Sequence, residues 1–171
     1  DPHAFNMALE VFPKISVKFK ENPIYKEVKK NYSEAKINQI NESTKQILFL
    51  SDNIEESLLK QHGDNNSWGY TDKDSFEYMM KNLYKVSTKI DKITIRLHPS
   101  EFPENFDWAI KKYGPLVEKN SSIPLIQELA NHEIVIGSES MAMVFALLCG
   151  KRVICSIPHS GKRFSLPYRE I

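Results

Sequence analysis

Short apolar, strand-like runs alternate with helical patterns from residue 46 onward, and this alternation constrains the fold more than any other feature. Continuous apolar strands are typical of a sheet covered on both faces. Strands that alternate with helices at this spacing form a parallel sheet with right-handed crossovers. The sequence therefore predicts an α/β fold: a doubly wound, Rossmann-like parallel sheet of about five strands flanked by helices. The expected strands are 46–50, 93–97, 114–118, 134–136 and 153–157.

Helices are expected between these strands because apolar residues recur there at helical spacing. Ser51-Asp52-Asn53 stands before the first helix and Asp72 before the second, and we interpret both as helix caps. Gly63 and Gly150 follow two of the helices as stop signals. The expected helices are 54–62, 72–90, 104–112, 124–131 and 141–148.

The leading part of the chain has no partner sheet of its own. It reads as a helix over 3–12, a strand over 15–19, a helix from Asn22-Pro23 to about residue 31, and a polar linker over 33–46. We therefore interpret 1–45 as the tail of a missing N-terminal domain with a linker, and 46–171 as one Rossmann-like domain. A domain of this size can bury a substantial core.

Composition excludes several classes of function. The net charge is +1 with both signs scattered, so no basic surface indicates nucleic acid. No apolar run approaches the roughly 20 residues of a membrane helix. Cys149 and Cys155 are interpreted as reduced thiols, which suits a cytoplasmic protein. No Cys/His spacing indicates zinc, and the Asp72-Lys73-Asp74 pair fits a helix start better than a metal site.

The strand at 93–97 ends at an Arg-Leu-His-Pro corner. Pro99 cannot donate to a ladder and biases His98 toward an extended conformation, which presents the imidazole at the carboxyl end of the strand. Ligands bind at that edge in open α/β sheets. Arg96 lies two residues earlier and therefore points to the same face. We predict that His98 contacts a phosphate; the alternative is a histidine bonded to a nearby carbonyl.

A second polar strand end follows forty residues later. Gly137 closes a buried strand, and Ser138-Glu139-Ser140 stands at the start of the next helix, where exposed amides bind anions. We predict a phosphate site shared with His98; simple capping by Ser138 is the alternative. Glu139 must point away from a phosphate, either to a ribose hydroxyl or toward the helix dipole. The basic segment 158–163 either folds over the anion or is a solvated loop.

These motifs together resemble the GT-B glycosyltransferases. The resemblance rests on Arg-x-His-Pro at 96–99, then strand-Gly-Ser-x-Ser-helix at 137–140, then Gly-Lys-Arg-Val-Ile at 150–154. More narrowly, the chain resembles bacterial sialyltransferases and related capsule or lipooligosaccharide glycosyltransferases, whose signatures include a His-Pro motif and a serine-pair motif. The match spans about 46–158, the donor-binding C-terminal half. It implies a glycosyltransferase of bacterial surface polysaccharide or lipooligosaccharide synthesis that uses a nucleotide-activated sugar, with CMP-sialic acid first among donors.

The resemblance also implies roles for individual residues. His98 is implied to touch the nucleotide phosphate and help the leaving group depart, while Ser138 and Ser140 bind the same phosphate. Glu139 separates the two serines where some relatives have adjacent hydroxyl residues. Such enzymes generally work without a bound metal, so the nucleotide-sugar is expected as substrate and no cofactor is expected. The remaining members of the predicted donor-binding set are Gly137, Arg96, Pro99, Glu139 and Ser51.

Further implications concern partners and location. The expected partners are a glycan acceptor and the missing N-terminal domain, which would hold the general base. We therefore expect this chain alone to bind nucleotide weakly and to transfer no sugar. The expected location is the cytoplasm, with peripheral association with the inner membrane left open.

Three other interpretations of the same strand ends stay open. A GT-B sugar-nucleotide epimerase or a CDP-glycerol phosphotransferase-like enzyme would bind phosphate in a similar way. A non-catalytic flavodoxin-like or response-module domain would bind a partner and no nucleotide. A response module should also carry an acidic cluster after its first strand, where Ser51-Asp52-Asn53 offers one carboxylate.

Overall fold

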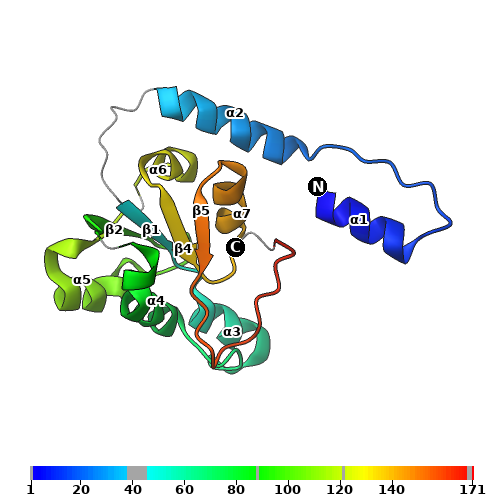
Figure 1. Cartoon of the computed structure of the whole chain (residues 1–171). Coiled ribbons are helices and arrows are strands. Elements are labelled where there is room, and N and C mark those ends of the chain that lie inside the picture. Colours follow the sequence, from blue (N-terminus) through cyan, green and yellow to red (C-terminus); the bar gives the residue numbers. More distant parts are fainter. Residues whose placement is uncertain (1, 38–45, 88, 121, 169–170) are drawn as a thin grey trace.

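A computed structural model describes residues 2–37, 46–87, 89–120, 122–168 and 171. Its centre is a five-stranded sheet in the order β3-β2-β1-β4-β5, with every neighbouring pair parallel (Figure 1). This confirms the predicted α/β, Rossmann-like fold. The strands are β1 (Gln46–Leu50), β2 (Lys92–Arg96), β3 (Val117–Lys119), β4 (Ile134–Gly137) and β5 (Arg152–Cys155).

Helices cover both faces of the sheet. One face packs against α4 (Asp72–Val86) and α5 (Asp107–Tyr113), and the other against α2 (Pro23–Ile37), α6 (Leu125–Asn131) and α7 (Met141–Leu148). Figure 1 shows α2 lying over α6 and α7, whereas α1 extends away from the sheet. The other elements are α1 (Pro2–Val11), α3 (Ile54–His62), η1 (Pro103–Phe106) and η2 (Gly114–Leu116).

The core follows from the alternation of side chains along these strands. On β1, Ile47 and Phe49 face α4 and α5, while Leu48 and Leu50 face α6 and α7. All four are 0–3% exposed, as expected of a central strand covered on both sides. The Phe49 ring meets Phe76 of α4 edge to face, with ring centroids 4.9 Å apart.

The strand order places a topological switch at β1. The chain proceeds from β1 outward through β2 and β3, then crosses to β4 on the other side of β1. In open α/β sheets the crevice outside the carboxyl ends of the strands at such a point is the usual ligand site. The edge formed by the ends of β2, β1 and β4 is therefore the place to look for function.

Several local predictions for the leading segment are wrong. Residues 15–19 form no strand: no other strand lies beside them, and Ile15 and Phe19 are exposed. Helix α2 continues to Ile37, so the linker expected over 33–46 begins no earlier than residue 38; residues 38–45 lie outside the described ones. Because α2 packs on the sheet through Val28, part of segment 1–45 covers the domain itself. The division at residue 45 stays a prediction.

Two predictions nearer the sheet also need correction. Thr71, not Asp72, caps α4, in a capping box with Asp74. The brief strand expected over 114–118 begins only at Val117, because Gly114–Leu116 forms a 3-10 turn. In the part of the chain that the structure describes, no helix is both long and apolar enough to cross a membrane.

Candidate functional site

The predicted site residues do gather at one edge of the sheet. Leu50, the last residue of β1, pairs with Arg96 on β2 and with Gly137 on β4. His98 lies two residues beyond Arg96, and Ser138-Glu139-Ser140 begins directly after Gly137. The turns after β2 and β4 therefore flank the turn after β1, at the carboxyl ends of all three strands.

Two aspartates, of which Asp72 is buried and Asp52 is half-buried, tie these turns together. The Asp52 Oδ2 atom accepts a hydrogen bond from the backbone N–H of Glu139, at 2.9 Å. Asp72, at the start of α4, accepts from the N–H groups of Asp52 at 2.9 Å and Ile54 at 2.5 Å. The sequence predicts both residues only as parts of helix caps, and no local pattern marks Asp52 as a site residue. Both instead fix the loops whose amides they bind.

Burial shifts the pKa of both aspartates upward. For Asp72, burial outweighs its two amide hydrogen bonds and raises the pKa to about 7. For Asp52, burial again raises the pKa, against the opposing effects of the Glu139 amide, the Ser140 hydroxyl and the nearby His98. Folding therefore favours the protonated form of each group.

We expect the Asp72 carboxyl to make the fold less stable as pH rises. The folded pKa of about 7 lies above the unfolded value of 3.8, so the folded state holds the extra proton between these limits. The free energy of unfolding should fall from about pH 4 to about pH 7 and then level, with an upper bound of about 4 kcal/mol. Urea unfolding of wild type and Asp72→Asn between pH 5 and pH 8 measures this: their difference in stability should change with pH. Parallel curves would contradict it, and Asp64→Asn on the surface serves as control.

His98 stands exposed at the tip of the turn after β2. Its backbone N–H donates to Glu101 Oε2 at 2.8 Å, and its Nδ1 atom lies 2.7 Å from Ser100 Oγ. Pro99 is also exposed and continues this turn with a trans peptide bond. No hydrogen bond to Nε2 is found among the described residues, so this nitrogen is available at the edge.

The two serines after β4 have different surroundings. Ser138 is 1% exposed and donates to Ser75 Oγ at 2.9 Å. The Ser75 hydroxyl is in turn hydrogen-bonded to the hydroxyl of Ser156, and the Ser156 hydroxyl donates to the Gly137 carbonyl at 3.0 Å. The Ser138 hydroxyl thus has a partner inside the fold. Ser140 is the N-cap of α7, and its hydroxyl makes no side-chain capping bond.

Gly137 allows a close approach within the protein. A β-carbon at this position would lie 3.2 Å from Leu50 and 3.2 Å from the sulfur of Met143. That contact is tighter than ordinary van der Waals packing. The structure therefore gives this glycine a role in packing β4 against β1 and α7.

Arg96 faces a buried carboxylate. Its guanidinium forms an ion pair with Glu128 of α6, whose side chain is 0% exposed, and donates to the Ile123 carbonyl at 2.9 Å. Burial raises the pKa of Glu128, opposed by the hydrogen bond and the charge of Arg96. Glu128 belongs to no recognisable sequence motif, so its ion pair with Arg96 could be identified only from the structure. The predicted phosphate contact of Arg96 stays a prediction.

Glu139 points toward the segment that follows β5. Its carboxylate pairs with Lys162 and accepts from the backbone N–H and the hydroxyl of Ser165. Although burial acts to raise its pKa, these hydrogen bonds hold the pKa of Glu139 below its ordinary value. The Lys162 ammonium also lies 3.4 Å from the centroid of the Trp68 ring. This places the basic 158–163 segment beside the β4–α7 turn.

That segment and loop 66–71 fit together at two glycines. A β-carbon on Gly69, which has φ +73°, would lie 2.8 Å from the Ser160 carbonyl oxygen. One on Gly161 would lie 2.6 Å from the buried Tyr70 ring. The two stretches of main chain are therefore in direct contact. The contact is reinforced by a hydrogen bond from the Lys162 N–H to the Trp68 carbonyl.

Three buried polar atoms at this edge make no hydrogen bond of good geometry with the described residues, although the Ser140 hydroxyl lies near enough to Asp52 to act on its pKa. They are the hydroxyl of Ser51, one carboxylate oxygen of Asp52 and the hydroxyl of Ser140. Buried polar atoms are nearly always hydrogen-bonded in folded proteins. Their position at the ends of β1 and β4 therefore marks the switch point as a place for a polar ligand or ordered water.

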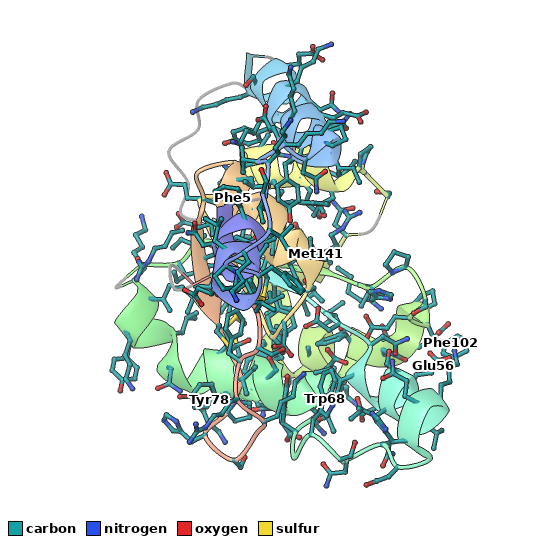
Figure 2. All side chains as sticks on the ribbon, turned by 90° about the vertical axis from the view of Figure 1, so that its right-hand side faces the viewer. Phe5, Glu56, Trp68, Tyr78, Phe102 and Met141 are labelled. Carbon is teal, nitrogen blue, oxygen red and sulfur yellow. The ribbon has the colours of Figure 1, made fainter. Side chains whose placement is uncertain are left out.

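A pocket of about 380 Å³ opens beside the His98 turn. Its walls combine aromatic rings with carboxylates and amides, and Figure 2 shows Phe102 and Glu56 close together on this side of the molecule. Within the described ranges, no three His, Cys, Asp or Glu residues are grouped so as to hold a metal ion. The pocket is lined by Asn53, Glu55, Glu56, Asp72, Lys73, Glu101, Phe102, Asn105, Phe106 and Trp108.

Comparison with known proteins bears on the fold. No protein-family model matches the sequence, and no curated protein sequence matches it. Among solved structures, the chain is similar to "Thermosulfurimonas dismutans KpsC, beta Kdo 2,4 transferase", with 16% identity and a TM-score of 0.50 over 80% of this chain and 46% of that one. The "beta Kdo 2,7 transferase" of the same KpsC also matches, with 15% identity and a TM-score of 0.46 over 89% and 46%. This chain thus spans a little under half the length of each, and it has the α/β fold found in part of the first.

Proposed function

We propose that this chain is the donor-binding domain of a GT-B glycosyltransferase that makes bacterial surface polysaccharide from a nucleotide-activated sugar. The observation that carries this proposal is the position of His98 and of the Ser140 and Ser51 hydroxyls on the turns that follow three neighbouring parallel strands, at one switch point. The fold shared with part of a Kdo transferase supports it independently. The acceptor and the second domain belong to the same proposal.

The donor we propose is a CMP-linked sugar. Kdo, the sugar named for the structural neighbour, is CMP-activated, which is compatible with the CMP-sialic acid donor expected from the motifs. A nucleoside monophosphate leaves with one phosphate group. One imidazole, one hydroxyl and one helix N-terminus are enough to surround such a group.

Catalysis in this proposal consists of stabilising the departing phosphate. As the bond from the sugar to the phosphate oxygen breaks, negative charge grows on the phosphate. The His98 Nε2 atom and the Ser140 hydroxyl would donate to those oxygens, joined by the first-turn amides of α7. When it is protonated, the imidazole can also give a proton to the leaving group, which returns the ring to its neutral form. The base that activates the acceptor hydroxyl is proposed to lie on the N-terminal domain.

Nucleotide titration by calorimetry tests the proposal. We expect the chain to bind CMP weakly and in preference to CDP and UDP. His98→Ala and Ser140→Ala should each weaken binding about ten- to a hundredfold, because each removes a hydrogen bond to a charged phosphate. His62→Ala, on the exposed end of α3, is the matched histidine control and should bind as wild type does.

Other outcomes would favour the competing interpretations. A preference for CDP would favour a CDP-glycerol phosphotransferase-like enzyme, and one for UDP a sugar-nucleotide epimerase. Binding that survives both substitutions would remove His98 and Ser140 from the site. No binding of any nucleotide, by a chain with a wild-type unfolding curve, would favour a non-catalytic domain.

A further inference from the structure

We infer that Asn53 and Ser100 are positioning residues that select the tautomer of the neutral His98 ring, with the proton on Nε2. The inference concerns a hydrogen-bonded relay between the turns after β1 and β2. Its use in catalysis rests on the proposed function, whereas the tautomer itself does not.

The tautomer follows from the donor that meets Nδ1. The backbone N–H of Ser100 points at His98 Nδ1, with 3.2 Å between the nitrogens. A backbone N–H can only donate, so Nδ1 must accept and carries no proton in the neutral ring. The single ring proton then resides on Nε2, the nitrogen with no partner in the described part of the chain.

The Ser100 hydroxyl reinforces this arrangement. Its oxygen lies 2.7 Å from His98 Nδ1 and 2.9 Å from the side-chain nitrogen of Asn53. An amide nitrogen is a donor, so the hydroxyl oxygen accepts from Asn53 and turns its own proton toward His98. Donation therefore runs in one direction, from Asn53 through Ser100 to the imidazole.

Asn53 is itself fixed in place. Glu56 Oε2 accepts from the same side-chain amide at 2.8 Å, so the NH2 end of Asn53 faces both partners. The Asn53 backbone has φ 53°, the one left-handed non-glycine conformation among the described residues, and its side chain is buried. Asparagine is one of the few residues that adopts this conformation readily. The relay thus begins in a rigid turn at the end of β1.

The turn that carries His98 is closed by Glu101. Its carboxylate accepts from the His98 N–H at 2.8 Å, and its own N–H donates to the His98 carbonyl at 2.9 Å. Three carboxylates lie in this region: Glu101 binds the His98 backbone, Asp52 interacts with the charge of His98, and Glu56 binds the Asn53 amide. Within the described part of the chain, the hydrogen bonds to the ring itself reach Nδ1, which leaves Nε2–H as a donor for an oxyanion. Contact with phosphate therefore does not require the ring to be charged.

Long-range nitrogen–proton NMR on the histidine-labelled chain tests the inference at pH 8, without any ligand. In wild type, the His98 signals should assign the proton to Nε2, with the His98→Ala spectrum identifying them. Asn53→Gly keeps the left-handed turn but removes the side-chain donor, and Ser100→Ala removes the hydroxyl. Because both variants keep the Ser100 backbone N–H, each should shift His98 only partly toward the other tautomer, while the exposed His62 stays unchanged. A proton on Nδ1 in wild type, or an unchanged His98 in both variants, would overturn the relay.

A parallel CMP titration separates this inference from the proposed function. Asn53→Gly and Ser100→Ala should weaken CMP binding about three- to tenfold, less than His98→Ala does, because the imidazole remains but its orientation is no longer fixed. If the tautomer is as expected and wild type binds no CMP, the relay stands and the proposed function fails. If CMP binds through His98 and both variants bind it as tightly as wild type, the positioning role is wrong.

Discussion

Arg96→Ala should destabilise the fold by about 3–5 kcal/mol. The substitution leaves the Glu128 carboxylate, whose side chain is 0% exposed, without its ion-pair partner Arg96. An uncompensated buried charge costs far more than a surface ion pair contributes. Urea unfolding followed by circular dichroism measures the loss, which should be smaller at pH 5 than at pH 8. Burial already raises the pKa of Glu128, so the stranded group can take up a proton at the lower pH.

The double variant Arg96→Ala/Glu128→Gln is the matched control. Replacing the stranded carboxylate by a neutral amide should restore most of the lost stability. A stable Arg96→Ala protein that has lost CMP binding would instead support the phosphate contact predicted for Arg96 from the sequence. If the double variant regains its stability, the main role of Arg96 is to neutralise Glu128 of α6.

Phe49→Ala should be about as damaging, with a loss of about 3–5 kcal/mol. Phe49 lies at the centre of β1, is 0% exposed, and touches Phe76 and Phe106 with ring centroids 4.9 Å and 6.0 Å away. Truncation removes the buried ring and leaves a cavity between the sheet and α4 that close-packed neighbours fill only in part. The unfolding midpoint in urea measures the loss.

Two variants calibrate this result. Phe49→Leu keeps most of the apolar volume and should cost clearly less than alanine. Phe102→Ala removes the same ring from a position that is 66% exposed and should change stability little. If both substitutions changed the free energy of unfolding equally, the packing of Phe49 against Phe76 and Phe106 would not be a main source of stability.

Local sequence was enough to predict the sheet. Strands such as 46–50 and 93–97 are continuous apolar runs, and the alternation with helices admits few other arrangements. The predicted strand at 15–19 failed because alternation alone was read as a strand, although a strand needs a neighbour to pair with. Helix α2 is longer than predicted because its packing on α6 and α7 stabilises a polar stretch with weak helical periodicity.

The site was predicted in outline and missed in detail. His98 and Ser140 do lie at one edge, because parallel strands end together. The partners of Ser138, Arg96 and Glu139 lie 63, 32 and 26 residues away in sequence, so no local pattern could identify them. The relay through Asn53 was hidden for the same reason: it joins two turns that only the folded sheet makes neighbours.

The interlocked glycines bear on how this protein tolerates mutation. At Gly69 and Gly161 any side chain would collide with the main chain or with the buried Tyr70 ring, so these two positions tolerate almost no substitution. Exposed residues around them, such as Asn66 and His159, face no such limit. Because this junction depends on shape, substitutions at the exposed neighbours should leave the path of the backbone beside the β4–α7 turn unchanged, whereas a side chain at either glycine should displace it.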